Sequence, residues 1–452
     1  MISKTFRDSL CALLWVPLLC GAIVSVSPAQ TAPSADAFLT WARANAKPIA
    51  SALPGPDTRD LAGLRTVVGT ARVIGVGESI HGIKEFLGLR QRVAQFLIEE
   101  MGFTAVALES GLPESRRVYD YVLGGPLPPG MWENGLTWTM GSFEGTRELI
   151  EWMRAWNLDP AHQKKIRFYG MDVLGGNGSW VPAANEVLAY LERVEPEYAA
   201  PVRARLIPLL EKFARPAFTE ANNAYSALPA ADRHAIATYV AELADRVASL
   251  RLHYIHKSSR EEYEWAHQIA ENLRYGNAML THYEARNGVN PVWNARDLAM
   301  AENVRWIRER EGPQGGVVVL AHNAHVQRAK SVQVPPNQAV QGMFLESLIG
   351  ADYKSIGFVF NRGTMPAGPG NRIPLPAADS TSIDGVLARV GPPMFLLDLQ
   401  TVPPGPAQAW LDRPVKQRIQ NLATDYNQRA SWNALIFVDQ ITPTRIFEGT
   451  PR

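Results

Sequence analysis

Residues 72–82 read Arg-Val-Ile-Gly-Val-Gly-Glu-Ser-Ile-His-Gly. The first five of them form a nearly continuous apolar run, which is typical of a strand buried on both faces of a parallel sheet. A short glycine-containing polar connection follows, and from Phe86 apolar residues recur at the three- and four-residue spacings of a helix. A strand, a tight turn and a helix in this order predict the first unit of an α/β fold.

Runs of the same kind recur along the rest of the chain. Each is four to six residues long and nearly continuous in apolar character. Amphipathic helical patterns lie between most of them, so we predict an α/β fold with a largely parallel sheet flanked by helices. The predicted strands after Arg72–Val76 are Thr104–Leu108, Ile166–Tyr169, Val317–Leu320, Ser355–Phe360, Met394–Leu397 and Ala434–Val438.

The pattern changes between Pro182 and Arg286. This segment contains long amphipathic helical patterns and no convincing strand, so we predict an all-helical insertion over residues 182–286. The insertion divides the α/β core into a first part, residues 31–181, and a second part, residues 287–452. Within the second part, Thr364–Pro376 is rich in proline and glycine and is predicted to be a surface loop.

Composition excludes several classes of function. The 452-residue chain carries 45 Lys and Arg against 44 Asp and Glu, so it has no general attraction for nucleic acid or anionic lipid. Both cysteines, Cys11 and Cys20, lie in the first 20 residues. The body of the chain therefore has no disulfide framework, thiol nucleophile or thiolate metal site.

The first 30 residues have the layout of a secretory signal peptide. Lys4 and Arg7 precede an apolar run from Leu10 to Val26, and the small residues of 27–30 suit cleavage near Ala29 or Gln30. The alternative is a membrane anchor, for which a run of about 17 residues is short. We expect a periplasmic or secreted protein without stable membrane insertion after cleavage.

Ionisable residues directly follow four of the predicted strands. In an open parallel sheet, ligands bind outside the carboxyl ends of the strands, so these side chains are expected at one edge. Any one of them could merely cap a helix or a turn, but the coincidence repeats from strand to strand. The residues are Glu78, His81, Glu109, Asp172, His322 and His325.

Glu78 and His81 lie three residues apart in a tight connection, which is a suitable arrangement for a general base oriented by a carboxylate. Arg90 shares the apolar stripe of the following helix, so its guanidinium needs a buried carboxylate partner. Glu78 and Glu109 are the candidates. Arg90 either forms a structural ion pair with them or acts as a cation that orients the acids or stabilises an oxyanion.

His322 and His325 follow a buried strand directly. One of them could act as a second acid or base, or both could bind a metal ion. A separate aromatic group, formed by Trp138, Met140 and Phe143, is predicted either to line the pocket of a bulky substrate or to belong to the core.

Common catalytic motifs are missing. The sequence contains no GxSxG nucleophile elbow, no HExxH, no P-loop and no GxGxxG. The usual route of a serine α/β-hydrolase therefore lacks its motif.

The sequence resembles the erythromycin esterase family from about residue 65 to 440. The matching segments occur in the family's order and are specific as a set rather than singly. They are Val76–Phe86, Leu89-Arg90, Glu100–Glu109, Glu151–Arg154, Phe168–Asp172, Arg296-Asp297, Met300–Asn303 and His322–His325.

This resemblance implies an α/β core with helical additions and a histidine general base that activates water. It also implies that no covalent enzyme intermediate forms and that a macrolide lactone is a candidate substrate. His81 matches the base, and Asp172 and Arg296 are expected to contact the substrate. Glu78, Glu109 and Arg90 match the surrounding polar cluster, and His322 and His325 match a second histidine pair.

With this resemblance, the favoured hypothesis is a hydrolase that opens a lactone or cleaves an ester with histidine-activated water and without a cofactor. The alternatives are a metal-dependent hydrolase that uses the same Glu and His residues, and a secreted binding protein without catalytic activity.

Overall fold

The computed structural model describes residues 33–283, 291–329, 338–368 and 370–447. The predicted signal peptide, residues 1–30, lies outside the described residues. No helix in the described ranges has both the length and the apolar character needed to cross a membrane.

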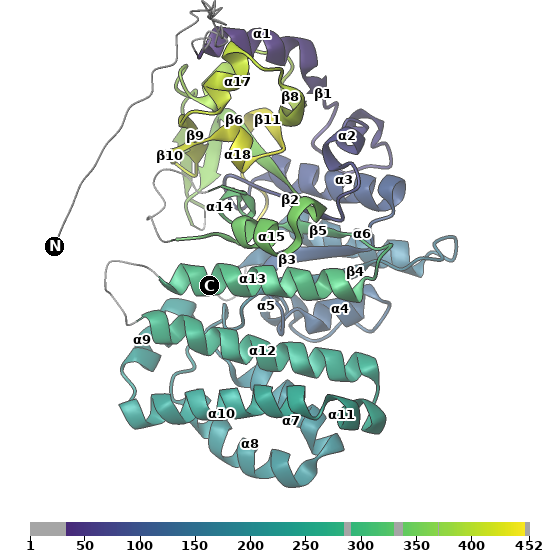
Figure 1. The fold of residues 1–452 in the computed structure, drawn as a ribbon, viewed down its shortest axis with the longest axis vertical. Coiled ribbons are helices and arrows are strands. Elements are labelled where there is room, and N and C mark those ends of the chain that lie inside the picture. The colour runs from purple at the N-terminus through teal and green to yellow at the C-terminus, as the bar shows by residue number, and fades with distance from the viewer. Residues whose placement is uncertain (1–32, 284–290, 330–337, 369, 448–452) are drawn as a thin grey trace, which may run out of the picture.

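A central nine-stranded sheet forms the frame of the molecule (Figure 1). Neighbouring strands from β11 to β4 pair in parallel, whereas β8, β1 and β7 join through antiparallel pairs. This arrangement confirms the predicted α/β fold with a largely parallel sheet. In spatial order the strands are β1 (Lys47–Pro48), β8 (Met394–Asp398), β11 (Ala434–Ile441), β6 (Tyr353–Pro366), β2 (Val73–Val76), β5 (Val317–Leu320), β3 (Ala105–Gly111) and β4 (Arg167–Asp172), with β7 (Arg372–Leu375) beside β6.

Both faces of the sheet are covered, which explains the continuous apolar runs. In β5, Val317 and Val319 belong to the hydrophobic cluster that contains helix α13 (Pro291–Arg310). Val318 and Leu320 belong to a second cluster with α3 (Lys84–Met101) and α6 (Glu144–Leu158). Because successive side chains point to opposite faces, every residue of such a strand must be apolar.

Helices occupy the chain between β4 and α13. Figure 1 shows most of them gathered on the side of α13 that faces away from the sheet. The described residues of this segment contain no strand, and α13 returns the chain to the sheet, where it packs against β4 and β5. The helices are α7 (Val181–Val194), α8 (Pro196–Glu211), α9 (Phe218–Ser226), α10 (Ala230–Ser249), α11 (Arg251–Lys257) and α12 (Arg260–Tyr283).

The remaining helices are short, apart from α1, and connect or cover the strands. The α-helices are α1 (Ala35–Asn45), α2 (Leu64–Val68), α4 (Arg116–Val122), α5 (Met131–Asn134), α14 (Asn323–Val326), α15 (Gln341–Ile349), α16 (Ile383–Leu387), α17 (Pro406–Leu411) and α18 (Gln428–Ser431). Single turns of tighter helix are η1 (Arg59–Leu61), η2 (Met140–Ser142), η3 (Gly350–Asp352) and η4 (Leu399–Thr401).

The predicted loop over Thr364–Pro376 is wrong. Strand β6 continues to Pro366, and β7 pairs with it from Gly363↔Leu375 to Pro366↔Arg372. Proline is compatible with an edge strand, because one side of such a strand needs no ladder hydrogen bond. A second small sheet, β9 (Val415–Ile419) with β10 (Leu422–Tyr426), was also not predicted.

Candidate active site

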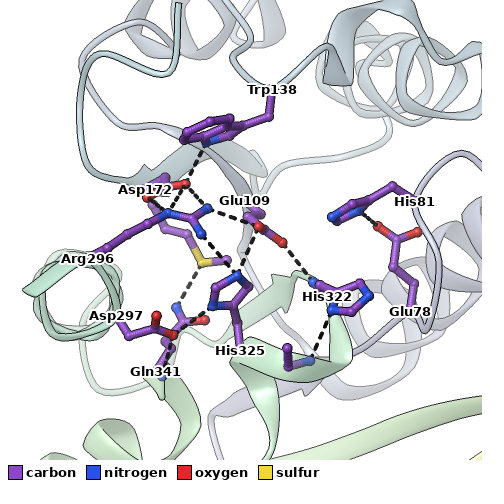
Figure 2. A network of polar contacts seen from close by, with 12 residues as sticks. Glu78, His81, Glu109, Trp138, Asp172, Arg296, Asp297, His322, His325 and Gln341 are labelled. Carbon is purple, nitrogen blue, oxygen red and sulfur yellow. Dashed lines mark hydrogen bonds and ion pairs between the residues drawn. The ribbon is translucent and has the colours of Figure 1, made fainter. Parts of the chain in front are cut away.

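The carboxyl edge of the sheet brings together ionisable side chains from several elements (Figure 2). The connection after β2 carries two of them, β3 and β4 carry one each, and the turn that forms α14 after β5 carries two more. Helix α13 adds an arginine and an aspartate from the side. The residues are Glu78 and His81, Glu109, Asp172, His322 and His325, and Arg296 and Asp297.

His81 is held by a buried carboxylate that is itself held by an arginine. The Nδ1 atom of His81 lies 2.8 Å from Glu78 Oε1, and Arg90 Nη1 lies 2.5 Å from the same oxygen. Glu78 and Arg90 are buried, whereas the His81 side chain is 33% exposed. In the described residues the Nε2 atom of His81 has no hydrogen-bond partner. Arg90 therefore orients Glu78, and Glu78 directs the free nitrogen of His81 outward.

Two glycines allow the chain to form this connection. A Cβ atom at Gly77 would lie 2.0 Å from the side-chain oxygen of Asn323, whose amide bonds the backbone of Phe358 and thereby ties α14 to β6. Gly82 has a left-handed φ of +72°, and a Cβ atom there would meet the Phe143 ring at 2.9 Å. The tight packing of these neighbours fixes the backbone that carries His81.

Burial and charge act in opposite directions on the pKa of His81. Burial lowers it, but the hydrogen bond and charge of Glu78, together with the charge of Glu109, outweigh burial and raise the pKa above 6.5. Burial opposes ionisation of Glu78, yet Arg90 and His81 keep the pKa of Glu78 below its usual value. Glu78 therefore stays charged and increases the basicity of His81.

A Glu78→Gln substitution is expected to shift the pH profile. A general base acts when it is neutral, so kcat/KM should fall as the pH drops below the pKa of His81. Removing the negative charge lowers that pKa, so the acid limb should move to lower pH, while the plateau should fall by at least about tenfold because the ring loses its orienting acceptor. Activity measured across the pH range tests this. An unmoved acid limb contradicts the assignment, and Glu148→Gln, an exposed carboxylate of α6, is the control.

Arg296 binds two carboxylates in the interior. Its Nε and Nη2 atoms approach the carboxylate of Asp172 at 3.0 Å and 2.5 Å, and Nη2 lies 3.1 Å from Glu109 Oε1. The Trp138 indole N–H donates a hydrogen bond to the same Asp172 carboxylate, with Nε1 2.7 Å from Oδ2. Burial opposes the charge of Arg296, but Asp172 and Glu109 overcome it and raise the pKa of the guanidinium. Nη1 alone donates to no carboxylate in the described residues.

His325 is a second cation at this edge. Its Nδ1 lies 2.7 Å from Asp297 Oδ1, and its Nε2 lies 3.2 Å from Glu109 Oε1. Burial lowers the pKa of His325, but Asp297 and Glu109 raise it to about 10. The ring is therefore an imidazolium at neutral pH, and the 3.2 Å contact between its Nε2 and Arg296 Nη1 joins two donors rather than a donor and an acceptor.

The positive charge of His325 should make the free energy of unfolding depend on pH. The raised pKa of His325 means that the folded protein binds this proton more tightly than the unfolded chain does. The stabilisation is complete below pH of about 6.5 and is lost as the pH rises towards about 10, with a slope of at most about 1.4 kcal/mol per pH unit. Urea unfolding between these pH values should show this loss in the wild type and not in His325→Gln. An equal loss in both proteins would contradict the assignment.

His322 is neutral, and both of its ring nitrogens have hydrogen-bond partners within the protein. Its Nε2 lies 3.1 Å from the carbonyl oxygen of Ser79, and its Nδ1 accepts from the backbone N–H of Ala324 at 3.2 Å. Burial, aided by the charge of His81, lowers the pKa of His322 to about 3. Because both ring nitrogens are engaged, His322 supports the turn beneath His81 and has no free nitrogen for acid–base work.

A cavity of about 1110 Å³ opens in front of these residues. Its wall contains His81, Glu109, Arg296, His322 and His325, so five of the predicted site residues meet one space. Trp138 also lines the cavity, which agrees with the first of the two positions predicted for it, a pocket wall or the core.

Five other predicted site residues do not reach the cavity. Asp172 is fully buried behind Arg296, where it positions the guanidinium and Trp138. Met140 and Phe143 belong to the hydrophobic core with residues of α3 and α6, so they do not form an apolar wall for a substrate. Glu78 and Arg90 lie behind His81, which leaves Arg90 unable to contact an oxyanion.

Most of the atoms at this edge that could bind a metal ion already have protein partners, and those of Glu109 are an example. Glu109 uses Oε1 for Arg296 and His325 and accepts from the backbone N–H of His322 through Oε2 at 2.8 Å. Within the described ranges, no group of three or more His, Cys, Asp and Glu side chains is arranged to hold a metal ion. The hypothesis of a metal-dependent hydrolase is therefore not favoured.

Several cavity residues were not predicted as functional. Asp297 stands next to Arg296 in one of the matching segments, so its sequence position could have indicated it. Phe218 of α9, Trp293 of α13 and Gln420 of the β9–β10 hairpin reach the cavity only through tertiary packing, and no local motif marks them.

The fold and the site define an α/β protein that presents a histidine–carboxylate pair at the carboxyl edge of its sheet, an arrangement suited to proton transfer. The family model of erythromycin esterase matches residues 98–441. The chain belongs to the erythromycin esterase family, and this membership supports the assignment of the protein as a hydrolase. Glu78, His81 and Arg90 precede the matched residues, so their roles rest on the geometry described above.

Known proteins resemble the chain over most of its length. Erythromycin esterase type II of Escherichia coli is 25% identical over 337 residues, which cover 72% of this chain and 78% of that protein. A crystal structure of a Bacillus cereus protein superimposes with a TM-score of 0.80 at 22% identity, covering 92% of this chain and 100% of the other. A mutant of the erythromycin esterase EreC in its open conformation gives a TM-score of 0.70 at 18% identity, and the superposition covers 86% of this chain and 95% of the other.

Proposed function

We propose that this protein hydrolyses a carboxylic ester or lactone with water activated by His81. One observation carries the proposal: His81 is fixed by Glu78 through Nδ1 and leaves Nε2 free beside a large cavity. Membership in the erythromycin esterase family supports the same reaction class.

The reaction follows from this geometry. Water attacks the carbonyl carbon of the substrate while its proton passes to Nε2 of His81. Glu78 stabilises the imidazolium that forms, and Arg90 keeps Glu78 in place and ionised. The tetrahedral intermediate then breaks the bond to the alcohol oxygen, which takes the proton back from His81. An ester yields an acid and an alcohol, and a lactone yields one hydroxy acid. A positioned base of this kind contributes about 10²–10⁴-fold to the rate.

Arg296 is the best-placed group to stabilise the oxyanion. It lines the cavity, and Asp172 and Glu109 hold its Nε and Nη2 atoms, which leaves the N–H groups of Nη1 without a carboxylate partner. The imidazolium of His325 beside it adds positive charge. Donors that are fixed before the reaction need no reorganisation when charge develops, and each contributes a few kcal/mol.

The size of the cavity favours a bulky substrate. Its volume of about 1110 Å³ lies just above the usual range for small-molecule sites, which ends at about 1000 Å³. The relatives named as erythromycin esterases make a macrolide lactone the first candidate.

Mass spectrometry of the reaction products tests the proposal. The purified protein is incubated with a panel of macrolides, simple lactones, acylated sugars and p-nitrophenyl esters. We expect at least one compound to gain one water, by ring opening or by division into acid and alcohol. If no carboxylic ester or lactone of the panel is consumed, the proposed function is wrong.

A further inference from the structure

Three residues of the described chain combine a side chain with a left-handed backbone. They are Trp138, Thr139 and Gln420, with φ values of 56°, 61° and 54°, and they are the non-glycine residues with positive φ in the described ranges. All three line the cavity that contains His81, although they come from two distant parts of the sequence. Such conformations cost free energy, persist only where the surroundings impose them, and concentrate at ligand-binding sites.

The surroundings of Trp138 and Thr139 impose their conformation. The Trp138 indole is fixed by its hydrogen bond to Asp172, and its ring meets the Phe218 ring at a centroid distance of 4.8 Å. The carbonyl oxygen of Thr139 accepts from the backbone N–H of Ser142 at 2.9 Å, at the start of η2. The turn therefore presents an aromatic surface beside the hydroxyl of Thr139, which has no hydrogen-bond partner in the described residues.

Gln420 is held in a comparable way at the tip of the β9–β10 hairpin. Ile419 pairs with Leu422, so Gln420 is the first residue of a two-residue hairpin loop, where glycine, asparagine or aspartate is preferred. Its backbone N–H donates to the Ser79 carbonyl oxygen at 2.9 Å, which is the same oxygen that receives His322 Nε2. The Gln420 side chain is exposed and makes no hydrogen bond within the described part of the chain.

We infer that Trp138, Thr139 and Gln420 form a clamp for the part of the substrate that does not react. The aromatic face of Trp138 and Phe218 suits an apolar ring surface, and the free Thr139 hydroxyl and Gln420 amide suit hydroxyl groups on that ring. The clamp selects esters and lactones with a hydroxyl-bearing ring, such as a macrolide or an acylated sugar. This inference rests on the proposed hydrolase function and adds specificity residues to it.

Substitutions that relieve the backbone strain at Gln420 can distinguish a role in substrate binding from a role in the fold. Gln420→Gly and Gln420→Asn both suit a positive φ better than glutamine, but only asparagine keeps an amide. For the best hydroxylated substrate, we expect Gln420→Gly to raise KM about three- to tenfold, the effect of one neutral hydrogen bond, without lowering Tm. Gln420→Asn should recover part of this loss, and Thr139→Gly should also raise KM. A merely structural role predicts instead that Tm falls and that Gln420→Asn gives no recovery.

The control and the choice of substrate make the outcomes distinguishable. Asn421→Gly loosens the same hairpin loop at an exposed residue that does not line the cavity, and its KM should match the wild type. An unchanged KM in Gln420→Gly, or an equal rise in Asn421→Gly, overturns the clamp. So does a wild type that hydrolyses p-nitrophenyl acetate but no hydroxylated ring, although the hydrolase function then stands. A wild type that consumes none of the panel overturns the proposed function itself.

Discussion

His81→Ala should lower the proposed esterase activity by about 10²–10⁴-fold while the protein stays folded. The ring supplies the only histidine nitrogen at the cavity that is free to accept a proton among the described residues, because His322 and His325 use both of theirs. The substitution also removes a partly exposed side chain rather than a core residue, so its cost in stability should be small. Steady-state rates, with circular dichroism and Tm of the same samples, measure both effects.

The matched control is His234→Ala, which removes an exposed histidine of α10 remote from the cavity. It should retain wild-type rates. A folded His81→Ala variant with near-normal turnover would show that another group activates the water. Residual activity that still rises with pH along the same limb would point to the same conclusion.

The sequence was sufficient to predict the central sheet because its strands are buried on both faces. Val317–Leu320 is apolar at every position, and such a run has few alternatives to a strand in a parallel sheet. The elements that were not predicted lack this signal. Lys47–Pro48 is too short, β7 contains a proline, and the β9–β10 hairpin has Gln420 where a turn residue is expected. Strand direction at the β8 edge depends on long-range pairing and is not encoded locally.

The clustering of the candidate residues was predictable where a strand end fixes the position of a side chain. Glu109 and His325 follow predicted strands, and their meeting at one edge is a consequence of parallel topology. The partner of Arg90 was also within reach of the sequence, since a guanidinium on an apolar stripe requires a carboxylate. The sequence could not show that His322 has no free ring nitrogen, because this depends on the position of the Ser79 carbonyl oxygen in another loop.

Arg296→Met should lower the free energy of unfolding by about 3–5 kcal/mol. The side chain is buried and compensates Asp172 and Glu109, which also lie in the interior. Methionine fills a similar volume but leaves Asp172 without a cation and leaves Glu109 with His325 as its cationic partner. The loss should shrink as the pH falls, because protonation removes the cost of a buried carboxylate that has lost its cation. Urea unfolding of wild type and variant at neutral and mildly acidic pH measures this difference, provided that the m-values agree.

Arg193→Met provides the comparison, because Arg193 pairs with Glu262 at the surface, where the two side chains are 58% and 47% exposed. Loss of such a pair should cost less than about 1 kcal/mol. The same Arg296→Met protein should also lose activity beyond what its stability explains, since Arg296 lines the cavity and is the proposed oxyanion donor. Equal destabilisation by the two substitutions would mean that Asp172 and Glu109 do not depend on Arg296. A strongly destabilised Arg296→Met protein that keeps wild-type kcat when folded would assign Arg296 to the fold and the oxyanion to another donor.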